Sequence, residues 1–283
     1  MTRMSFNARA TALLLLLAMP VFAQVAEGDR HYAARAEGAS GARAKAEHID
    51  AAIAAYQKAI AANPNDIEAH WKLLRSYRYK GAYVAANAEQ KKQIYGMAKT
   101  AGEKALAVVN ARLGTNAKSS EQQVAEAAKR VPGAGEVFFW DSVNWGEWAL
   151  AYGKMAAARQ GAADRIKRGA TIALLVDPRM ELGSPARVLG RLHDQTPRIP
   201  FVTGWASSKE AVRFLNESLK IDPTNKLTLV FLAEAMVAAD SSKKTQALQM
   251  LRSAVNTPVH PDYPVEDAAS IEDAKALLRK WGS

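Results

Sequence analysis

The sequence predicts an all-α fold in which pairs of antiparallel helices stack into a solenoid, with some extra helices. Three observations predict it. One pattern of small and bulky residues recurs along the 283-residue chain at helical spacing. Each copy of the pattern ends at a proline or an asparagine, which stops a helix. No stretch alternates between apolar and polar residues as a half-buried strand would.

In the recurring pattern, a small residue is followed four positions later by a bulky one, and three positions after that by a second small one. Five segments share this spacing, and in the last the stop comes one residue early: Ala52-Tyr56-Ala59-Pro64, Ala98-Gly102-Ala105-Asn110, Ile166-Ala170-Ala173-Pro178, Ala211-Leu215-Ser218-Pro223 and Ala247-Leu251-Ala254-Pro258. In the second and third segments a small residue, Gly102 or Ala170, takes the bulky position, and Ile166 takes the first small one. Small residues at this spacing share one helix face and let a neighbouring helix approach closely. The pattern is typical of the second helix of a tetratricopeptide (TPR) repeat, whose copies build concave binding surfaces.

The first residues are typical of a secretory signal peptide. Arg3 and Arg9 lead into an apolar run over residues 12–22, and Val21-Phe22-Ala23 fits a cleavage site. We expect residues 1–23 to be removed and the mature protein to reside in the periplasm. The alternative, an uncleaved anchor, is disfavoured because a membrane span needs about 20 apolar residues.

Composition narrows the function classes further. The chain has no cysteine, so we expect neither a disulfide nor a lipid anchor. The net charge of +10 indicates a basic surface. It does not indicate nucleic-acid binding, because the expected export and the absence of a recognition motif argue against that partner.

The predicted elements follow in order. After residues 24–42, which we expect to be a flexible segment, residues 43–283 read as a single TPR-like α-helical domain. Its first hairpin pairs residues 43–62 with residues 67–80. The remaining helical segments are residues 83–110 as one long helix or a broken pair, a short helix over 121–130, hairpins over 136–175, 184–221 and 226–256, and a last helix over 270–281 that could cap the solenoid. A long proline-containing loop, residues 196–208, interrupts the 184–221 pair.

Most of the chain that follows the expected signal peptide resembles a known family. The residues that carry the resemblance are the run from Gly183 to His193, then Pro197, Pro200, Gly204, Lys209, Ala211, Leu215 and Pro223, the Leu232-Ala233-Glu234 triplet, the aromatic Trp140, Trp145, Gly146 and Trp148, and Trp71, Leu73 and Tyr77 of the first hairpin. This set is similar to the T component (TatT) of TPR-associated TRAP transporters, which are tripartite periplasmic importers. The resemblance spans residues 44–276.

The resemblance implies an all-α TPR-like fold, self-association into a homo-oligomer and docking to the periplasmic solute-binding protein of a TRAP transporter. It also implies an apolar tunnel for a hydrophobic or amphipathic small molecule. Members of the family are often lipoproteins, and this chain departs from them because it has no cysteine.

The helix over residues 67–80 supplies the first candidate binding residues. Its packing positions leave Trp71, Arg75, Arg78 and Tyr79 for the concave groove. Arginine beside aromatic rings suits an anionic or amphipathic ligand, through charge-assisted hydrogen bonds and stacking. In the alternative interpretation, Trp71 fills a gap between hairpins and the arginines are solvated.

The aromatic helix near residue 145 carries two stripes. Phe138, Trp145, Trp148 and Tyr152 share one face, which is more typical of a core. A second face carries Trp140, Asn144 and Glu147, whose mixed character suits the wall of a ligand site. An exposed helix face would explain the polar members of that stripe equally well.

Three further candidates surround the proline-containing loop. Arg187 and Arg191 are one helical turn apart and could bind an acidic partner or a substrate carboxylate. Equally, Arg191 could hydrogen-bond carbonyl groups of the loop. Trp205 could act as a lid or anchor an interface, or it could simply pin the loop to the solenoid.

The sequence contains no common catalytic or metal-binding motif. The five histidines are scattered, and no nucleophile elbow, phosphate loop or metalloprotease motif occurs. We therefore expect no enzyme activity, no metal and no cofactor. The leading hypothesis is a periplasmic accessory component of a TRAP-type system. The alternatives are a TPR scaffold for cell-envelope assembly without a small ligand, and an enzyme with an unrecognised site.

Overall fold

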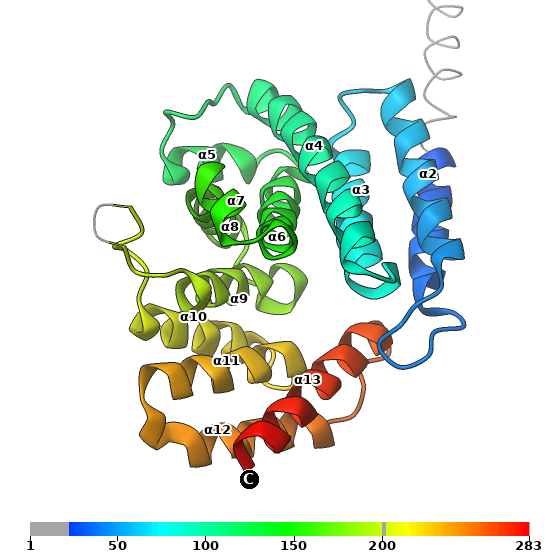
Figure 1. The fold of residues 1–283 in the computed structure, drawn as a ribbon. Helices are drawn as coiled ribbons and strands as arrows, with labels where there is room; N and C mark the ends of the chain where they lie inside the picture. Colours follow the sequence, from blue (N-terminus) through cyan, green and yellow to red (C-terminus); the bar gives the residue numbers. More distant parts are fainter. Residues whose placement is uncertain (1–22, 200–201, 283) are drawn as a thin grey trace, which may run out of the picture.

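The computed structural model describes residues 23–199 and 202–282, and every regular element in them is a helix (Figure 1). The one β feature of these residues is an isolated bridge between Ser40 and Arg43. The predicted all-α class is confirmed. None of the described helices is long and apolar enough to cross a membrane. Of the expected signal peptide, residues 1–22 lie outside the described part of the chain.

The segment that precedes the first hairpin is helical. Residues 23–33 form an α-helix that continues into the 3-10 turn η1 (Ala34–Ala36). This corrects the expectation of a flexible segment over residues 24–42. The segment is held by contacts distant in sequence, such as the 2.8 Å hydrogen bond that Tyr56 donates to Asp29. A polar composition alone gives no sign of such contacts.

The first predicted hairpin consists of α2 (Ala46–Ala62) and α3 (Ile67–Tyr79). The side chain of Asp66 caps α3 by accepting a hydrogen bond from a backbone amide of its first turn. A single turn of π-helix, η2 (Lys80–Val84), then leads into α4 (Ala88–Leu113). The long segment after the first hairpin is therefore one continuous helix rather than a broken pair.

The middle of the chain forms α5 (Glu121–Ala128), α6 (Ala134–Tyr152), α7 (Lys154–Arg159) and α8 (Ala162–Val176). α6 packs against α4 on one side and α8 on the other, and it also contacts α3. The predicted second hairpin is thus the pair of α6 and α8, with α7 as an extra helix between them.

The remaining helices are α9 (Met180–Gln195), α10 (Ser208–Ile221), α11 (Lys226–Ala239), the short η3 (Ser241–Lys243), α12 (Lys244–Asn256) and α13 (Pro264–Gly282). α9 packs against α10, and α11 against α12, as the sequence predicts. α13 begins at Pro264, earlier than the expected start at residue 270, because proline is favourable in a first helical turn.

The small and bulky residues of the recurring pattern lie in helix contacts. In all five segments, the three pattern residues, such as Ala52, Tyr56 and Ala59 in the first, are buried. α8 approaches α6 so closely that a Cβ atom on Gly169 would lie 2.8 Å from the carbonyl oxygen of Phe138. The predicted TPR-like solenoid of helical hairpins with extra helices is therefore confirmed.

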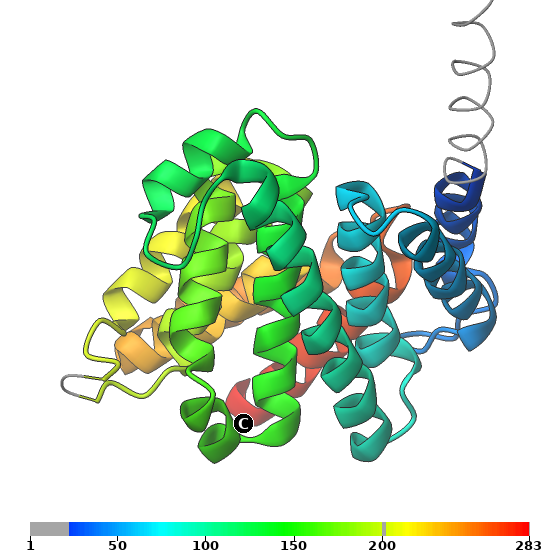
Figure 2. The ribbon, with the colours of Figure 1, turned by 90° about the horizontal axis from the view of Figure 1, so that it is seen from above.

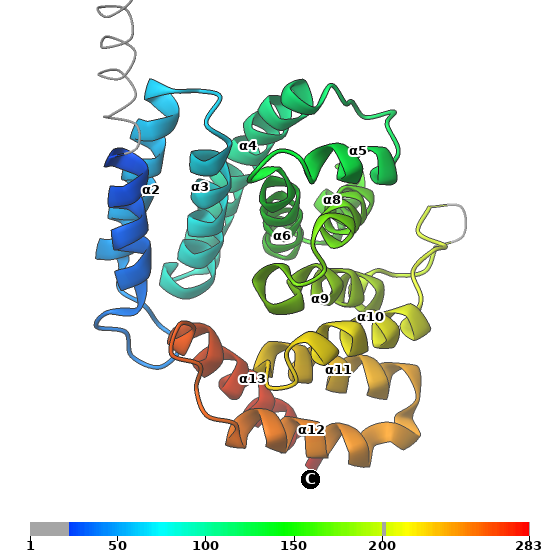
Figure 3. The same ribbon diagram turned by 180° about the vertical axis from the view of Figure 1, so that it is seen from behind.

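The helices follow one another around a central region, so that the segment before α2 comes close to the start of α13 (Figures 1 and 3). The segment before α2 lies beside the start of α13, where Arg35 Nη2 is 3.1 Å from Glu266 Oε1. Seen from above, α2–α4 and α5–α8 form two groups, with α11–α13 passing behind both (Figure 2). The solenoid thus closes on itself, and its inner helix faces share one interior space.

Candidate functional site

A cavity of about 870 Å³ occupies this interior. Its walls come mainly from α6 and α9. Further contributions come from α3, α7, α8, α11, the described part of the loop over residues 196–203, and the segment that leads into the first turns of α13. Small-molecule sites typically enclose about 300–1,000 Å³. The cavity is therefore large enough for a metabolite or a single-chain lipid.

Most of the cavity wall is apolar, and this part of the wall reaches the protein surface. α6 contributes Val143, Gly146 and Leu150, and α7 contributes Met155. Leu150 is 74% exposed and Met155 is 70% exposed. A Cβ atom on Gly146 would meet no atom within 4 Å, so this turn of α6 borders open space. Large exposed apolar side chains that gather at one opening are typical of a binding site, because most soluble proteins expose few contiguous apolar patches.

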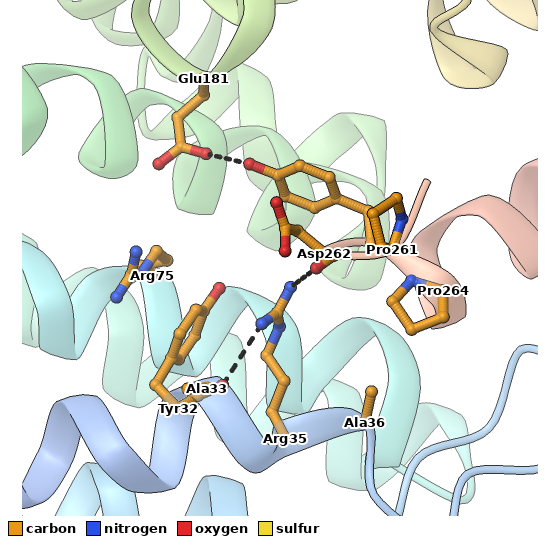
Figure 4. Close-up of a pocket in the computed structure, with 10 residues that line it drawn as sticks. Tyr32, Ala33, Arg35, Ala36, Arg75, Glu181, Pro261, Asp262 and Pro264 are labelled. Carbon is orange, nitrogen blue, oxygen red and sulfur yellow. Dashed lines mark hydrogen bonds between the residues drawn. The ribbon is translucent and has the colours of Figure 1, made fainter. Parts of the chain in front are cut away.

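The opposite part of the wall is polar and joins a second cavity of about 370 Å³ (Figure 4). Four residues line both cavities: Tyr32, Arg75, Glu181 and Tyr263. They come from the N-terminal helix, α3, the start of α9 and the segment before α13. Figure 4 shows Glu181 reaching from α9 toward Arg75 and Tyr32, and its carboxylate accepts a hydrogen bond from the hydroxyl of Tyr263. The closure of the solenoid therefore creates the polar end, because residues from both ends of the chain contribute to it.

Arg78 belongs to this polar end and has a carboxylate partner. It donates a 2.7 Å hydrogen bond to the hydroxyl of Tyr83, and its Nε lies 3.5 Å from Glu147 Oε1. Burial alone would lower the pKa of Arg78, but the neighbouring Tyr83 and Glu147 raise it above the usual value. Its positive charge is thus compensated within the protein.

Arg187 has only neutral partners. Its guanidinium donates 3.2 Å hydrogen bonds to Asn225 Oδ1 and Thr228 Oγ1, and another to Ser184. No carboxylate of the described residues lies within 4.0 Å of it. Burial and the positive charge of Arg78 lower the pKa of Arg187 to about 10. The guanidinium is therefore held in place while its charge is poorly compensated.

Arg75 likewise has no carboxylate within 4.0 Å among the described residues. Its guanidinium lies over two aromatic rings, with Cζ 3.7 Å from the ring centre of Tyr32 and 4.9 Å from that of Trp71. The charge of Arg75 acts on the carboxylate of Glu181. Burial raises the pKa of Glu181, and the charges of Arg75 and Arg187 partly offset that rise.

The backbone that carries Glu181 is strained. Glu181 and Leu182 adopt left-handed conformations with φ of 46° and 59°, followed by Gly183 at 80°. Outside glycine such a conformation costs roughly 1–2 kcal/mol per residue. The regular part of α9 begins only at Ser184, as the sequence predicts. The strained turn directs Glu181 and Leu182 to the cavity wall, and strain of this kind is concentrated at functional sites.

The structure brings most of the sequence-predicted site residues to one cavity. Those that line it are Arg75, Arg78, Tyr79, Trp140, Glu147, Arg187 and Arg191. Trp140 is also a core residue, because it lies in the buried cluster between α3 and α6. Arg191 already has acidic partners, with Asp194 at 3.0 Å and Glu234 at 2.8 Å. Whether these residues bind a ligand stays a prediction.

Three predicted site residues lie outside the cavity wall. Trp71 packs against Gly133 at the start of α6, which matches the gap-filling alternative. Asn144 is fully buried and donates hydrogen bonds to the carbonyl oxygens of Leu74 and Trp140. Trp205 pins its loop by donating a hydrogen bond to Asp164. Their contacts are structural: each joins two elements that are separate in sequence.

Sequence reasoning missed three residues of the polar end. Tyr32 lies in the segment that was expected to be flexible, Tyr263 in a proline-rich connection, and Glu181 in a turn between two predicted pairs. None carries a motif. The proline that follows Gly183 and Ser184 marks the start of α9, but it does not indicate a left-handed turn before it.

The arrangement can bind a molecule that has an apolar part and a charged or polar end. In residues 23–199 and 202–282, no group of three or more acidic or histidine side chains could hold a metal ion. His193 Nδ1 accepts a hydrogen bond from the backbone amide of Ser207, and Asp194 pairs with Arg191 instead of with His193. Apolar walls with fixed cationic groups at one end are the features of a site for an amphipathic molecule.

Comparisons with known proteins give no family assignment. The chain matches no protein-family profile and no curated protein. Among solved structures it is similar to a chain of the "TPR2AB-domain:pHSP90-complex of yeast Sti1", at 15% identity, with 94% of this chain and 100% of that chain covered. The TM-score of 0.33 is too low for that likeness to support an assignment of fold or function.

Proposed function

We propose that this chain is a periplasmic, TPR-like accessory component of a TRAP-type transport system. It binds a hydrophobic or amphipathic small molecule in the central cavity and docks to a solute-binding protein. The single observation that carries ligand binding is the cavity of about 870 Å³, with its apolar wall along α6 and α7 and its arginines at the other end. Periplasmic location and the transport role rest on the sequence alone.

The cavity would hold its ligand without covalent chemistry. Removing apolar surface from water stabilises a complex by roughly 25 cal/mol per Å², so the apolar wall supplies most of the affinity. The polar end would fix the orientation of the ligand. Docking of a partner would shift the ligand between the two proteins only as far as their affinities differ in the docked state.

The ligand-binding part is tested by extraction. Mature protein, residues 24–283, is purified and extracted with organic solvent, and the extract is analysed by mass spectrometry. We expect one class of lipid-like molecule in near-stoichiometric amount. A Gly146→Leu variant should lose it, because the new side chain extends into open cavity space without meeting a neighbour.

The matched control is Arg213→Gln. Arg213 lies on α10 in exposed ion pairs with Glu210 and Glu217, away from the cavity wall. This variant should keep the ligand, and all three proteins should melt at similar temperatures. A clean extract from wild type, even after incubation with dodecanoic acid and with periplasmic lysate, would contradict a ligand-carrying role.

One observation favours a second function, a TPR-like scaffold without a small ligand. Leu150, Met155 and Val202 form an exposed apolar surface that could meet a protein instead of covering a ligand. Hairpin solenoids are commonly interaction scaffolds. A Met155→Glu change should then abolish capture of an envelope-assembly partner. If the protein is a carrier, the partner captured from periplasm should instead be a TRAP solute-binding protein.

The periplasmic location has its own test. N-terminal sequencing of the exported protein should show cleavage after Ala23.

A further inference from the structure

We propose that the polar end of the cavity binds one anionic oxyacid group of the ligand, a carboxylate or a phosphate, between Arg75 and Arg187. This inference deepens the proposed function and rests on it, because it assigns the ligand's chemical class and its orientation. The apolar remainder of the ligand would lie along α6 and α7, where the wall is formed by residues such as Val143, Leu150 and Met155.

The first argument is the balance of charges in the described residues around this end. Three other basic groups of the wall have carboxylates within 4.0 Å: Arg78 with Glu147, Arg191 with Asp194 and Glu234, and Lys226 with Asp267. The remaining lysine of the wall, Lys154, is exposed on α7, on the apolar side of the cavity. In the smaller cavity Arg35 has Glu266. Arg75 and Arg187 have none at that distance. More distant carboxylates act on them: Glu181 acts on both, and Asp222 acts on Arg187. Neither guanidinium group is therefore directly paired with a carboxylate of the described residues.

The second argument is preorganisation. Three neutral acceptors hold Arg187: Asn225, Thr228 and Ser184. The guanidinium of Arg75 packs over the ring of Tyr32, 3.7 Å from the ring centre. Planar guanidinium groups in fixed positions match the paired oxygens of a carboxylate or phosphate. A partly buried cation without a compensating charge is unfavourable, and a ligand anion would remove that penalty.

The third argument concerns Glu181, which competes with the ligand anion for the same two arginines. Its carboxylate is held near them by the strained turn, and the hydroxyl of Tyr263 donates to it across 3.5 Å. An acid in this position weakens the binding of a second anion. Replacing it with a neutral isostere should therefore strengthen anion binding. A residue with only a structural role would not give that gain.

The experiment measures the binding of three soluble probes that share a twelve-carbon chain. They are dodecanoic acid, dodecanol and dodecyl phosphate, titrated at pH 8 below their aggregation limits by calorimetry. We expect wild type to bind at least one of the two anions at least about tenfold more tightly than the alcohol. The stronger of the two anions identifies whether the natural head group is a carboxylate or a phosphate.

Variants assign the effect to the named residues. Arg75→Gln and Arg187→Gln should each lose about tenfold in affinity for the preferred anion, with dodecanol affinity unchanged. Glu181→Gln should gain several-fold for the anion alone. Arg213→Gln, on the far helix α10, should match wild type for all three probes. Dodecanol binding in each variant shows that the cavity is intact, and if Arg187→Gln fails to fold, Arg75→Gln decides.

Two results would overturn the inference in different ways. If wild type binds the alcohol and both anions equally, or if the preference survives in Arg75→Gln and Arg187→Gln, the cavity is a ligand site but the anion site is wrong. If none of the three probes binds and the organic extract is also clean, the proposed carrier function fails together with it.

Discussion

At the residue scale, Asp141 is an acid in a place that does not favour its charge. It is 5% exposed on α6, and its side chain abuts Gly102 of α4, where a Cβ atom would lie 2.0 Å from Asp141 Oδ1. Burial raises the pKa of Asp141 to about 7, with Arg165 offsetting part of the rise. Gly102 therefore makes room for a carboxyl group that is largely protonated below pH 7.

This raised pKa makes stability depend on pH. The unfolded chain ionises Asp141 near pH 4, whereas the folded protein keeps the proton up to about pH 7. The contribution is therefore fully present below pH 4, is lost as the pH rises from 4 to 7, and stays lost above. The difference between the two pKa values of Asp141 corresponds to a loss of at most roughly 4 kcal/mol in the free energy of unfolding.

Asp141→Asn should remove this dependence, because the amide has nearly the same shape and no charge. We expect the variant to melt at a higher temperature than wild type at pH 8 and at a similar temperature at pH 4, measured by calorimetry. Asp262→Asn, whose side chain is 80% exposed, is the control and should change neither value. Equal destabilisation of Asp141→Asn at both pH values would show that the ionised form is tolerated in the fold.

His193 should show the opposite dependence on pH. Its Nδ1 accepts the amide hydrogen of Ser207, which requires a neutral ring. Burial lowers the pKa of His193, with Lys167 and Arg213 adding to the effect and Glu210 opposing it. The stability that this ring contributes is present above the unfolded pKa of about 6.5 and is lost as the pH falls below it.

The loop that ends at Ser207 should therefore open in mild acid. We expect the protection factor of the Ser207 amide against hydrogen exchange, which corrects for the intrinsic exchange rate at each pH, to fall below pH 6. In a His193→Asn variant, the side-chain oxygen can accept the same hydrogen bond at any pH, so this loss of protection should disappear. If wild type and variant respond alike, another group opens the loop.

At the element scale, the contacts between helices depend on small residues that the sequence displays. The recurring pattern predicted which face of α2, α4, α8, α10 and α12 would be buried, because spacing along a helix fixes direction. Helix ends were also predictable, since Asn63-Pro64 and Asp177-Pro178 stop a helix locally. These features depend on residues within a few positions of one another.

Gly169 and Gly146 form a matched pair that tests this packing. Both lie inside helices, but a Cβ atom on Gly169 would lie 2.8 Å from the Phe138 carbonyl oxygen, whereas one on Gly146 would meet nothing. Gly169→Ala should lower the free energy of unfolding by about 1–3 kcal/mol through overpacking. Gly146→Ala should raise it by about 1 kcal/mol, because alanine favours a helix. Urea titration measures both, and a stabilised Gly169→Ala would mean that α6 and α8 can separate at little cost.

The candidate site was predictable only in part, and the reason is physical. Arg75, Arg78 and Glu147 were found because a helical position predicts which face a side chain occupies. Their neighbours Tyr32 and Tyr263 come from opposite ends of the chain. Their meeting depends on how far the solenoid curves, which is the sum of many small packing angles. No local sequence pattern determines how these packing angles add up, so the polar end of the cavity could not be predicted from the sequence.

At the scale of the whole molecule, that curvature brings the N-terminal segment onto α13, and one arginine fastens the contact. Arg35 and Glu266 are 3.1 Å apart, with side chains only 8% and 19% exposed. The guanidinium also donates to the backbone oxygens of Tyr32 and Asp262. It lies 5.3 Å from the ring centre of Tyr79 on α3. One side chain thus connects the first segment, the first hairpin and the last helix.

Arg35→Met should loosen both ends of the chain together. Removing one partner of a buried ion pair typically costs about 3–5 kcal/mol, because the other charge is left uncompensated. We expect a large loss of stability and faster hydrogen exchange over residues 23–36 and 259–266 alike. The double variant Arg35→Met with Glu266→Met should recover part of the loss, since it leaves no buried charge alone. Faster exchange confined to residues 23–36 would mean that the N-terminal segment rests on a solenoid that keeps its curvature unaided, and that the ring of helices is not held closed by this contact.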